Sequence, residues 1–233
     1  VLKRLADAER DGDRVHAVLI GVGSSSDGRA KSIYAPRSSG QARAVLAALA
    51  DAGVQPGDLD LLEAHGTGTK AGDATEAEGL RQVFGFARVA PLAVGSVKSQ
   101  IGHTKAAAGA AGLIKAALAV QGGFLPPTAK VRSPLPAFRE AGSGLALNTA
   151  LRPWVAPAGR VRRAGVSAFG FGGSNFHVVL EEVATPRTEP SWDGAVQLLA
   201  ASAPDRAGLR AALLALADEV QRDGADAAGE RSR

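Results

Sequence analysis

Residues 63–69 read Glu-Ala-His-Gly-Thr-Gly-Thr (EAHGTGT) and complete a short apolar run, residues 59–64, that has the length of a buried strand. The glycines allow a tight turn and a close approach of the backbone to a ligand. The hydroxyls of Thr67 and Thr69, two residues apart, can point the same way. Polar turns at strand ends are the usual ligand sites of α/β sheets, so His65 is a first candidate functional residue.

A second polar segment, VKSQIGHT at residues 97–104, closes another apolar run and opens an Ala-rich helix predicted over 104–120. A histidine at a helix N-terminus lies in a positive potential, which favours the neutral imidazole. Lys98 has the same effect. The pattern therefore predicts that His103 is a neutral hydrogen-bond donor.

The third segment is FGFGGSN at residues 169–175, between predicted strands at 166–171 and 175–182. A turn this rich in glycine exposes backbone N–H groups, which suits an oxyanion hole. It also leaves an aromatic ring, that of Phe171, free to swing.

The order outward from these segments is strand, helix, strand, helix, strand, helix and then an antiparallel pair, which predicts an α/β layered fold. The run at 15–23 indicates a strand covered on both faces, and the alternating strand at 175–182 indicates an outer strand. Asp73 and Glu76 have the spacing of a capping box that starts a helix at Asp73. The remaining elements are a helix at 41–52, a strand at 92–97, and a loop at 122–160 with one short strand.

Gly109 and Gly112 lie inside the Ala-rich helix, where each glycine costs about 1 kcal/mol relative to alanine. Close contact with another backbone is the expected compensation.

The composition changes at about residue 184. We expect residues 1–183 to form the main domain and 184–233 a linker segment, with a strand at 195–202, an amphipathic helix at 205–220 and a disordered tail.

The chain has 233 residues, 45% of them hydrophobic, which is enough for one sizeable core. A net charge of +4, spread along the chain, does not predict nucleic-acid binding. No apolar run reaches the ~18 residues of a membrane span, and no signal peptide is evident, so we expect a cytoplasmic protein. There is no cysteine, which excludes disulfides, zinc–thiolate sites and a cysteine nucleophile within these residues. Methionine is also absent, so we expect a piece of something longer.

Histidines and glycine-rich turns also occur for purely structural reasons. A single buried histidine is usually structural, and we interpret His16 and His177 in this way. A metal site at His65 and His103 lacks a third ligand at normal spacing, so no metal is expected. A phosphate-binding loop and a serine-hydrolase elbow both lack their motifs.

Taken together and in order, EAHGTGT, VGSVKSQIGHTKAAAG and VSAFGFGGSNFH resemble the C-terminal half of β-ketoacyl synthases. The similarity is greatest to ketosynthase domains of type I polyketide synthases and of enzymes like polyunsaturated-fatty-acid synthases. The resemblance implies the C-terminal half of a thiolase-like layered fold, followed by the start of a ketosynthase–acyltransferase linker.

The resemblance also implies a reaction, the decarboxylative Claisen condensation of an acyl thioester with a malonyl-type carrier-protein thioester. In this family the acyl acceptor is a cysteine of the N-terminal half. We therefore expect these residues alone to be inactive, and poorly soluble because one layer face stays open.

The family pattern assigns roles residue by residue. His65 and His103 correspond to the catalytic histidines, and Lys98 to the lysine that tunes and orients His103. Thr67 and Thr69 correspond to the threonines that contact pantetheine. Phe171 corresponds to the gating phenylalanine, whose N–H joins the oxyanion hole, with Phe169 and Gly170 beside it. Gln100 replaces a common asparagine, with little effect expected.

The implied partners are an acyl carrier protein, whose phosphopantetheine carries the substrates, the N-terminal ketosynthase half and an acyltransferase domain. The family also implies a homodimer, and no cofactor bound directly. Two other hypotheses stay open, a non-catalytic remnant or docking module of a megasynthase, and a thiolase relative that does not decarboxylate.

Overall fold

The structure is a computed structural model that describes residues 1–29, 35–86, 90–140, 142–156, 159–183 and 201–230. The chain divides into two compact units, Val1–Ala184 and Thr185–Arg233.

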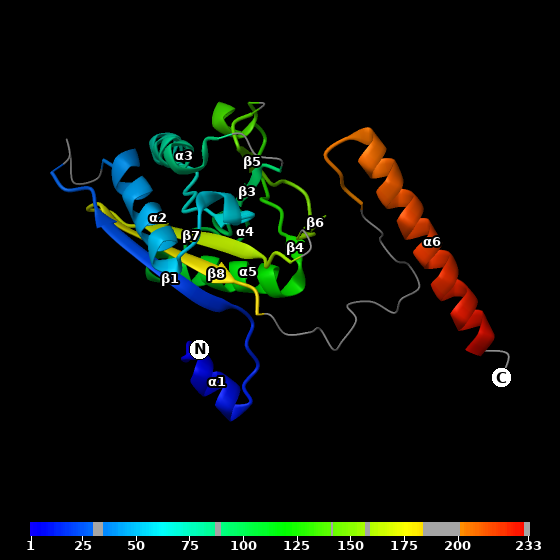
Figure 1. Ribbon diagram of the computed structural model, residues 1–233. Coiled ribbons are helices and arrows are strands. Elements are labelled where there is room, and N and C mark those ends of the chain that lie inside the picture. The colour runs from blue at the N-terminus through cyan, green and yellow to red at the C-terminus, as the bar shows by residue number, and fades with distance from the viewer. Residues whose placement is uncertain (30–34, 87–89, 141, 157–158, 184–200, 231–233) are drawn as a thin grey trace. The chain divides into compact units, whose positions relative to one another are not determined.

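A six-stranded sheet organises the first unit (Figure 1). Its order is β1 (Val18–Ser26), β8 (Ser174–Glu181), β7 (Arg163–Phe169), β2 (Leu61–Glu63), β3 (Leu92–Gly95) and β5 (Leu145–Leu147). The last four strands are parallel, whereas β8 runs antiparallel to both β7 and β1. The carboxyl ends of β7, β2 and β3 consequently share one edge of the sheet, and all three candidate segments leave from that edge.

Helices cover both faces of the sheet. Helices α2 (Ser38–Ala52) and α3 (Lys70–Phe84) lie on one face, and α5 (Ala108–Gly122) lies on the other (Figure 1). Because successive strand residues face opposite ways, Leu62 packs in the core under α2 and α3, and Leu61 packs in the core under α5. The α/β layered architecture predicted from the sequence is therefore confirmed.

Two strands differ from the prediction. β1 is an edge strand with Val22 exposed, so it is not covered on both faces along its whole length, and β8 lies inside the sheet rather than outside it. The glycines of β1 allow α2 to pack closely on one face, whereas Leu19 packs against the core on the α5 side. A Cβ on Gly21 would lie 2.4 Å from the carbonyl oxygen of Ala48, and one on Gly23 would lie 2.1 Å from that of Ala44.

Helix α3 begins at Lys70, earlier than predicted, because the Thr69 hydroxyl caps it by accepting from the N–H of Gly72 at 3.2 Å. The predicted capping box of Asp73 and Glu76 is wrong. Both carboxylates instead accept hydrogen bonds from backbone N–H groups of the preceding turn.

The predicted helix over 104–120 is also divided differently. The segment forms a short helix α4 (Lys98–Ile101), a 3₁₀ turn η2 (Lys105–Ala107) and then α5. Gly102, with φ of 78°, ends α4 and turns the chain before His103.

The region 122–160 contains more structure than the single strand predicted. It holds β4 (Phe124–Leu125), η3 (Pro136–Phe138), β5 and β6 (Arg152–Pro153), and a further 3₁₀ turn, η1 (Pro56–Asp58), precedes β2. The buried Asn148 organises the region because its amide donates to the carbonyls of Pro126 at 2.7 Å and Ala150 at 2.9 Å.

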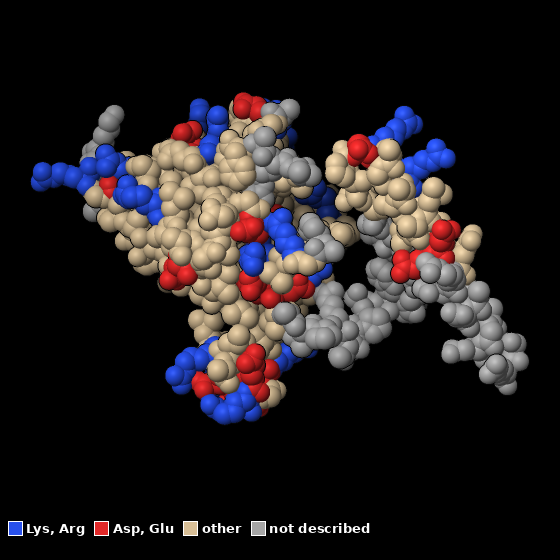
Figure 2. Space-filling model, viewed as in Figure 1, with Lys and Arg blue, Asp and Glu red and all other residues tan. Residues whose placement is uncertain are grey.

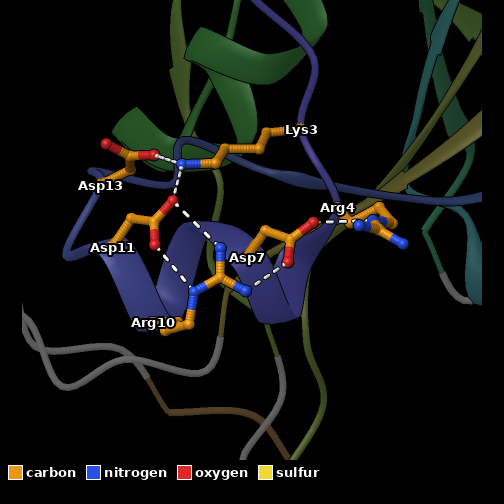
Figure 3. A network of polar contacts seen from close by, with 6 residues as sticks. All are labelled: Lys3, Arg4, Asp7, Arg10, Asp11 and Asp13. Carbon is orange, nitrogen blue, oxygen red and sulfur yellow. Dashed lines mark hydrogen bonds and ion pairs between the residues drawn. The ribbon is translucent and has the colours of Figure 1, made fainter.

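The N-terminal helix α1 (Leu5–Asp11) carries a chain of ion pairs among Lys3, Arg4, Asp7, Arg10, Asp11 and Asp13 (Figure 3). Exposed pairs of this kind contribute only ~0–1 kcal/mol each. Figure 2 shows acidic and basic side chains intermixed around α1 at the bottom of the view, with a wide uncharged surface above it.

The second unit contains helix α6 (Arg206–Glu230), which extends ten residues past the end predicted at 220. Alanine-rich sequence favours this continuation. The predicted strand at 195–202 lies mainly outside the described residues, and Ala201 and Ser202 are not in a strand. Of the helices in the described part of the chain, none has the length and hydropathy to cross a bilayer.

Candidate active site

Three neighbouring strands place the candidate residues at one edge of the sheet. His65 follows β2, Lys98 and His103 follow β3, and Phe169 ends β7. β2 pairs with both β3 and β7, so the loop of His65 lies between the other two. The structure therefore brings these four residues into one region.

The two histidine rings meet edge to face. The ring centroids of His65 and His103 are 5.6 Å apart, with an interplanar angle of 87°. The ring of Phe169 lies 5.8 Å from that of His65 on a tilted plane. Such a spacing lets both imidazoles reach a single small group placed between them.

A hydrogen bond indicates which nitrogen of His103 holds its proton. Nδ1 lies 3.0 Å from the backbone N–H of Lys105 and accepts from it. In a neutral ring the proton is then on Nε2, which is a donor. His103 is exposed, but the desolvation of its ring, with the charges of Lys98 and Lys105, lowers the pKa of His103 and favours this neutral form.

His65 is neutral for similar reasons. Burial, followed by the charges of Lys98 and His103, lowers the pKa of His65 to about 4. At neutral pH both rings are therefore uncharged and each has one N–H to donate.

Lys98 is half-buried behind the histidines. Burial lowers the pKa of Lys98, whereas the carboxylates of Glu63 and Glu76 oppose that effect. The Lys98 cation thus acts on both rings, and the two acidic groups stabilise its charge.

Glu76 is a functional candidate that the sequence analysis treated only as a cap. Its buried carboxylate accepts from the N–H groups of His65 and Gly66, both at 2.8 Å, and so fixes the turn that carries His65. Burial raises the pKa of Glu76 to about 7, although these two N–H groups favour the charged form. The sequence carried one signal of this role, because Glu76 is an acidic residue beside the apolar, inward-facing positions Ala77, Leu80 and Phe84.

The two threonines of the first segment point together, with their hydroxyl oxygens 3.0 Å apart. Thr67 is partly exposed and Thr69 is exposed. The side-chain arrangement expected from their alternate positions is therefore present.

The turn after β7 differs from the sequence-based expectation in one respect. The N–H of Gly170 donates to the carbonyl of Ser174 at 2.8 Å, so this N–H closes the turn and is not free for an oxyanion. Gly172 and Gly173 have φ values of 86° and 79°, which place Phe171 at the tip. The Phe171 side chain is 86% exposed, and that of Phe169 is buried.

A cavity of about 440 Å³ lies behind the turn that carries His65. The residues that line it include Thr67, Glu76, Lys98, Thr128, Phe138 and Leu147. In the described part of the chain, no three histidine or acidic side chains gather as metal ligands would.

Comparison with known proteins identifies the family. The profile described as "Beta-ketoacyl synthase, C-terminal domain" matches residues 16–132, and "Ketoacyl-synthetase C-terminal extension" matches residues 135–228. The chain belongs to the β-ketoacyl synthase family.

Several relatives of this ketosynthase chain are very large. It is 46% identical to a polyunsaturated fatty acid synthase of Thraustochytrium sp., over 96% of this chain and 8% of that protein. It is 43% identical to erythronolide synthase EryA2 of Saccharopolyspora erythraea, over 98% of this chain and 6% of that protein. The chain thus spans less than a tenth of each of these two relatives.

A solved ketosynthase has the same fold. The ketosynthase from module 6 of the bacillaene synthase of Bacillus subtilis 168 superposes with a TM-score of 0.73 and 41% identity, over 79% of this chain and 35% of that one. The expectation of a thiolase-like fold is confirmed, and the chain corresponds to the C-terminal part of a ketosynthase of type I megasynthases.

Proposed function

We propose that this chain supplies the histidine half of a ketosynthase active site that performs decarboxylative Claisen condensation in polyketide or fatty-acid assembly. The observation that carries the proposal is the perpendicular pair of neutral imidazoles, His65 and His103, 5.6 Å apart at the sheet edge. Family membership supports an acyltransferase-type enzyme.

The chemistry requires such a pair. When a malonyl-type thioester loses CO2, the electron pair of the broken C–C bond moves onto the thioester carbonyl and forms an enolate. Hydrogen bonds from two neutral N–H donors stabilise the charge on its oxygen, and one donor of this kind is worth ~2.7–4 kcal/mol. The enolate carbon then attacks an acyl thioester, a new C–C bond forms, and the thiolate leaves.

Lys98 keeps the donors neutral in this proposal. An ammonium beside both rings disfavours imidazolium, because a second positive charge would be close to it. A neutral imidazole is a donor that is not itself acidic enough to lose its proton to the enolate. This role is electrostatic, and it agrees with the tuning of His103 implied by the family pattern.

Thr67 and Thr69 are proposed to bind the pantetheine arm of an acyl carrier protein. Their adjacent hydroxyls suit the amide groups of that arm. Phe171 is proposed to gate the site, since its ring is exposed at a turn that glycines make adaptable. Gly170 and Phe169 form the base of that turn.

The partners of the chain are proposals of the same kind. A cysteine must come from an N-terminal ketosynthase half, because the chain has none. Ile101, Ile114 and Leu118, on α4 and α5, are 60%, 61% and 49% exposed and offer an apolar face for that half. Residues 184–233 are proposed to begin the connection to an acyltransferase domain, and the complete enzyme is proposed to be a homodimer.

The test is reconstitution. The chain, joined to the cysteine-bearing segment of its ketosynthase, is incubated with acyl and malonyl thioesters of an acyl carrier protein, and the β-ketoacyl product is measured by mass spectrometry. Product formation supports the proposal. A folded, acylated protein that neither releases CO2 nor condenses would favour the alternative, a non-catalytic remnant or docking module, which the lack of a cysteine here keeps open.

A further inference from the structure

A carboxylate lies at the centre of the three segments that form the site. Glu63 is the last residue of β2, two residues before His65, and is 2% exposed. Its Oε1 accepts from the backbone N–H of Val97 at 2.5 Å, and its Oε2 accepts from Nζ of Lys115 at 2.7 Å. Each oxygen of Glu63 thus has a partner, in a region where buried charge is costly.

One partner of Glu63 lies beside a proposed catalytic residue, and the other lies in the helix that follows one. Val97 directly precedes Lys98, in the turn that leads to His103. Lys115 lies in α5, which starts five residues after His103. One side chain therefore joins the His65 strand, the Lys98 turn and the helix behind His103.

Stability alone does not explain a charged pair at this position. The side chains of Lys115 and Glu63 are 12% and 3% exposed, and a buried ion pair is usually no more stabilising than well-packed apolar residues. An apolar pair would, however, leave the N–H of Val97 without an acceptor. What the carboxylate adds over an apolar pair is this acceptor, which ties the Lys98 turn to the end of β2.

The surrounding structure is shaped around this carboxylate. A Cβ on Gly112 of α5 would lie 3.0 Å from Cγ of Glu63 and 3.2 Å from Cγ1 of Val166. Gly112 has no side chain at the point where α5 contacts Glu63, and the close packing there leaves the Glu63 side chain little freedom to move. The compensation for Gly112 is thus contact with side chains, and not with another backbone as the sequence predicted.

We propose that Glu63, held by Lys115, is a positioning residue that fixes the separation between the His65 loop and the Lys98–His103 segment, so that both imidazoles address one oxygen. This inference rests on the proposed function. Neither residue touches the substrate, and the effect passes through the N–H of Val97.

Two double variants of the complete ketosynthase separate the role of the acceptor from that of the charge. Glu63→Gln/Lys115→Met removes the ion pair but keeps an oxygen for Val97, whereas Glu63→Met/Lys115→Met removes both. Arg163→Met/Glu181→Met is a matched control, because it removes a partly buried ion pair between β7 and β8, away from the site.

Two rates are measured for each variant, acyl loading of the cysteine and release of CO2 from the malonyl thioester. We expect Glu63→Met/Lys115→Met to lose about 100-fold in CO2 release, the cost of a displacement of about 1 Å, with acyl loading unchanged. Glu63→Gln/Lys115→Met should retain CO2 release to within about tenfold, because the hydrogen bond that sets the geometry remains. The control should match the wild type in both rates.

Equal losses in the two Glu63 variants would overturn the proposal, as would a loss of acyl loading in parallel with CO2 release, which is the sign of general destabilisation. Absence of condensation in the wild type would instead refute the proposed function. The ring ¹⁵N signals of His65 and His103 then decide the inference separately. A change in the ring ¹⁵N chemical shifts in Glu63→Met/Lys115→Met but not in Glu63→Gln/Lys115→Met supports the positioning role of Glu63. Any other pattern contradicts that role.

Discussion

The imidazole rings of His65 and His103 meet edge to face, with an angle of 87° between their planes. Each ring is close enough to disfavour a charge on the other, since His103 contributes to the lowered pKa of His65. The pair is therefore most stable when both members are neutral.

Removal of either ring should abolish most of the decarboxylation. We expect His65→Ala and His103→Ala each to reduce CO2 release from a malonyl thioester by about 100- to 1000-fold, because each removes one donor to the enolate oxygen. The rate is measured on the complete ketosynthase at saturating substrate.

His16→Ala is the matched control for the histidine variants. His16 precedes β1 and is exposed. Nδ1 of its ring lies 2.7 Å from Oε1 of Gln121. We expect it to keep the wild-type rate. Full activity in His65→Ala or His103→Ala would refute the two-donor mechanism.

Lys98→Met should shift the acid limb of the pH–rate profile to higher pH. The Lys98 cation lowers the pKa of both histidines, so its loss raises both. Because the neutral rings are the proposed active forms, protonation should then remove activity at a less acidic pH. The profile of CO2 release and an NMR titration of the rings measure the shift.

Lys105→Met is the comparison for Lys98→Met. Lys105 contributes to the lowered pKa of His103 but not to that of His65. Only the His103 signal should therefore move in the titration. An acid limb that stays in place in Lys98→Met would show that Lys98 does not set the protonation of the pair.

Loss of the Glu76 carboxylate should destabilise the fold at the His65 turn. Glu76→Ala leaves the N–H groups of His65 and Gly66 buried without an acceptor, at a cost of about 1–3 kcal/mol each. Glu76→Gln keeps one oxygen and should lose about half as much. Urea denaturation of the complete ketosynthase measures both, and equal losses would contradict the two-acceptor role.

Glu76 should also give stability a distinct pH dependence. Its pKa in the fold, about 7, is above the ordinary value of 4.5, so the folded state keeps a proton that the unfolded state loses. The free energy of unfolding contributed by Glu76 is therefore full below pH ~4.5 and decreases up to pH ~7. The free energy of unfolding of the wild type should fall relative to that of Glu76→Gln as the pH rises over this range, and a difference independent of pH would refute the raised pKa.

Gly112→Ala and Gly109→Ala should differ in sign. Alanine favours a helix interior by about 1 kcal/mol, but its Cβ at position 112 would crowd Glu63 at 3.0 Å and Val166 at 3.2 Å. Because Glu63 is fixed by its partners, we expect a net loss of about 1–3 kcal/mol. At position 109 the nearest atom, Cβ of Ala168, is 3.5 Å away, an ordinary contact.

Because Gly109 is the second residue of α5, where glycine costs less than in the helix interior, Gly109→Ala should be neutral or stabilising by less than about 1 kcal/mol. Thermal melting of the two variants in the complete ketosynthase distinguishes the two cases. Equal stabilisation in both would mean that Glu63 can yield, and this would also weaken the positioning role inferred for it.

The layered fold was predictable because its signals are local. Each strand that ends at the site is a short apolar run followed by a polar turn, and the helices between them carry apolar faces. The histidine, lysine and threonine positions were likewise visible as polar groups at strand ends, and the structure brings His65, Lys98 and His103 together as those positions require.

The roles of the acidic residues were not predictable from local pattern. Asp73 and Glu76 have capping-box spacing, yet the helix begins at Lys70 and both side chains turn back to the preceding loop. The hydrogen bonds that Glu76 accepts from the N–H groups of the His65 turn stabilise the fold more than a helix cap would. The contact between Glu63 and Val97, 34 positions apart, depends on strand pairing that no nearby residue reveals.

The pairing of β2 with β3 has a consequence for the spacing of the two histidine loops. Hydrogen-bonded strands lie about 4.8 Å apart in every sheet, since the length of the N–H···O=C bond sets that spacing. The points at which the two loops leave the sheet are therefore separated by a constant of the peptide backbone. Beyond those points the course of each loop depends on its own contacts, such as the hydrogen bond between Glu63 and Val97.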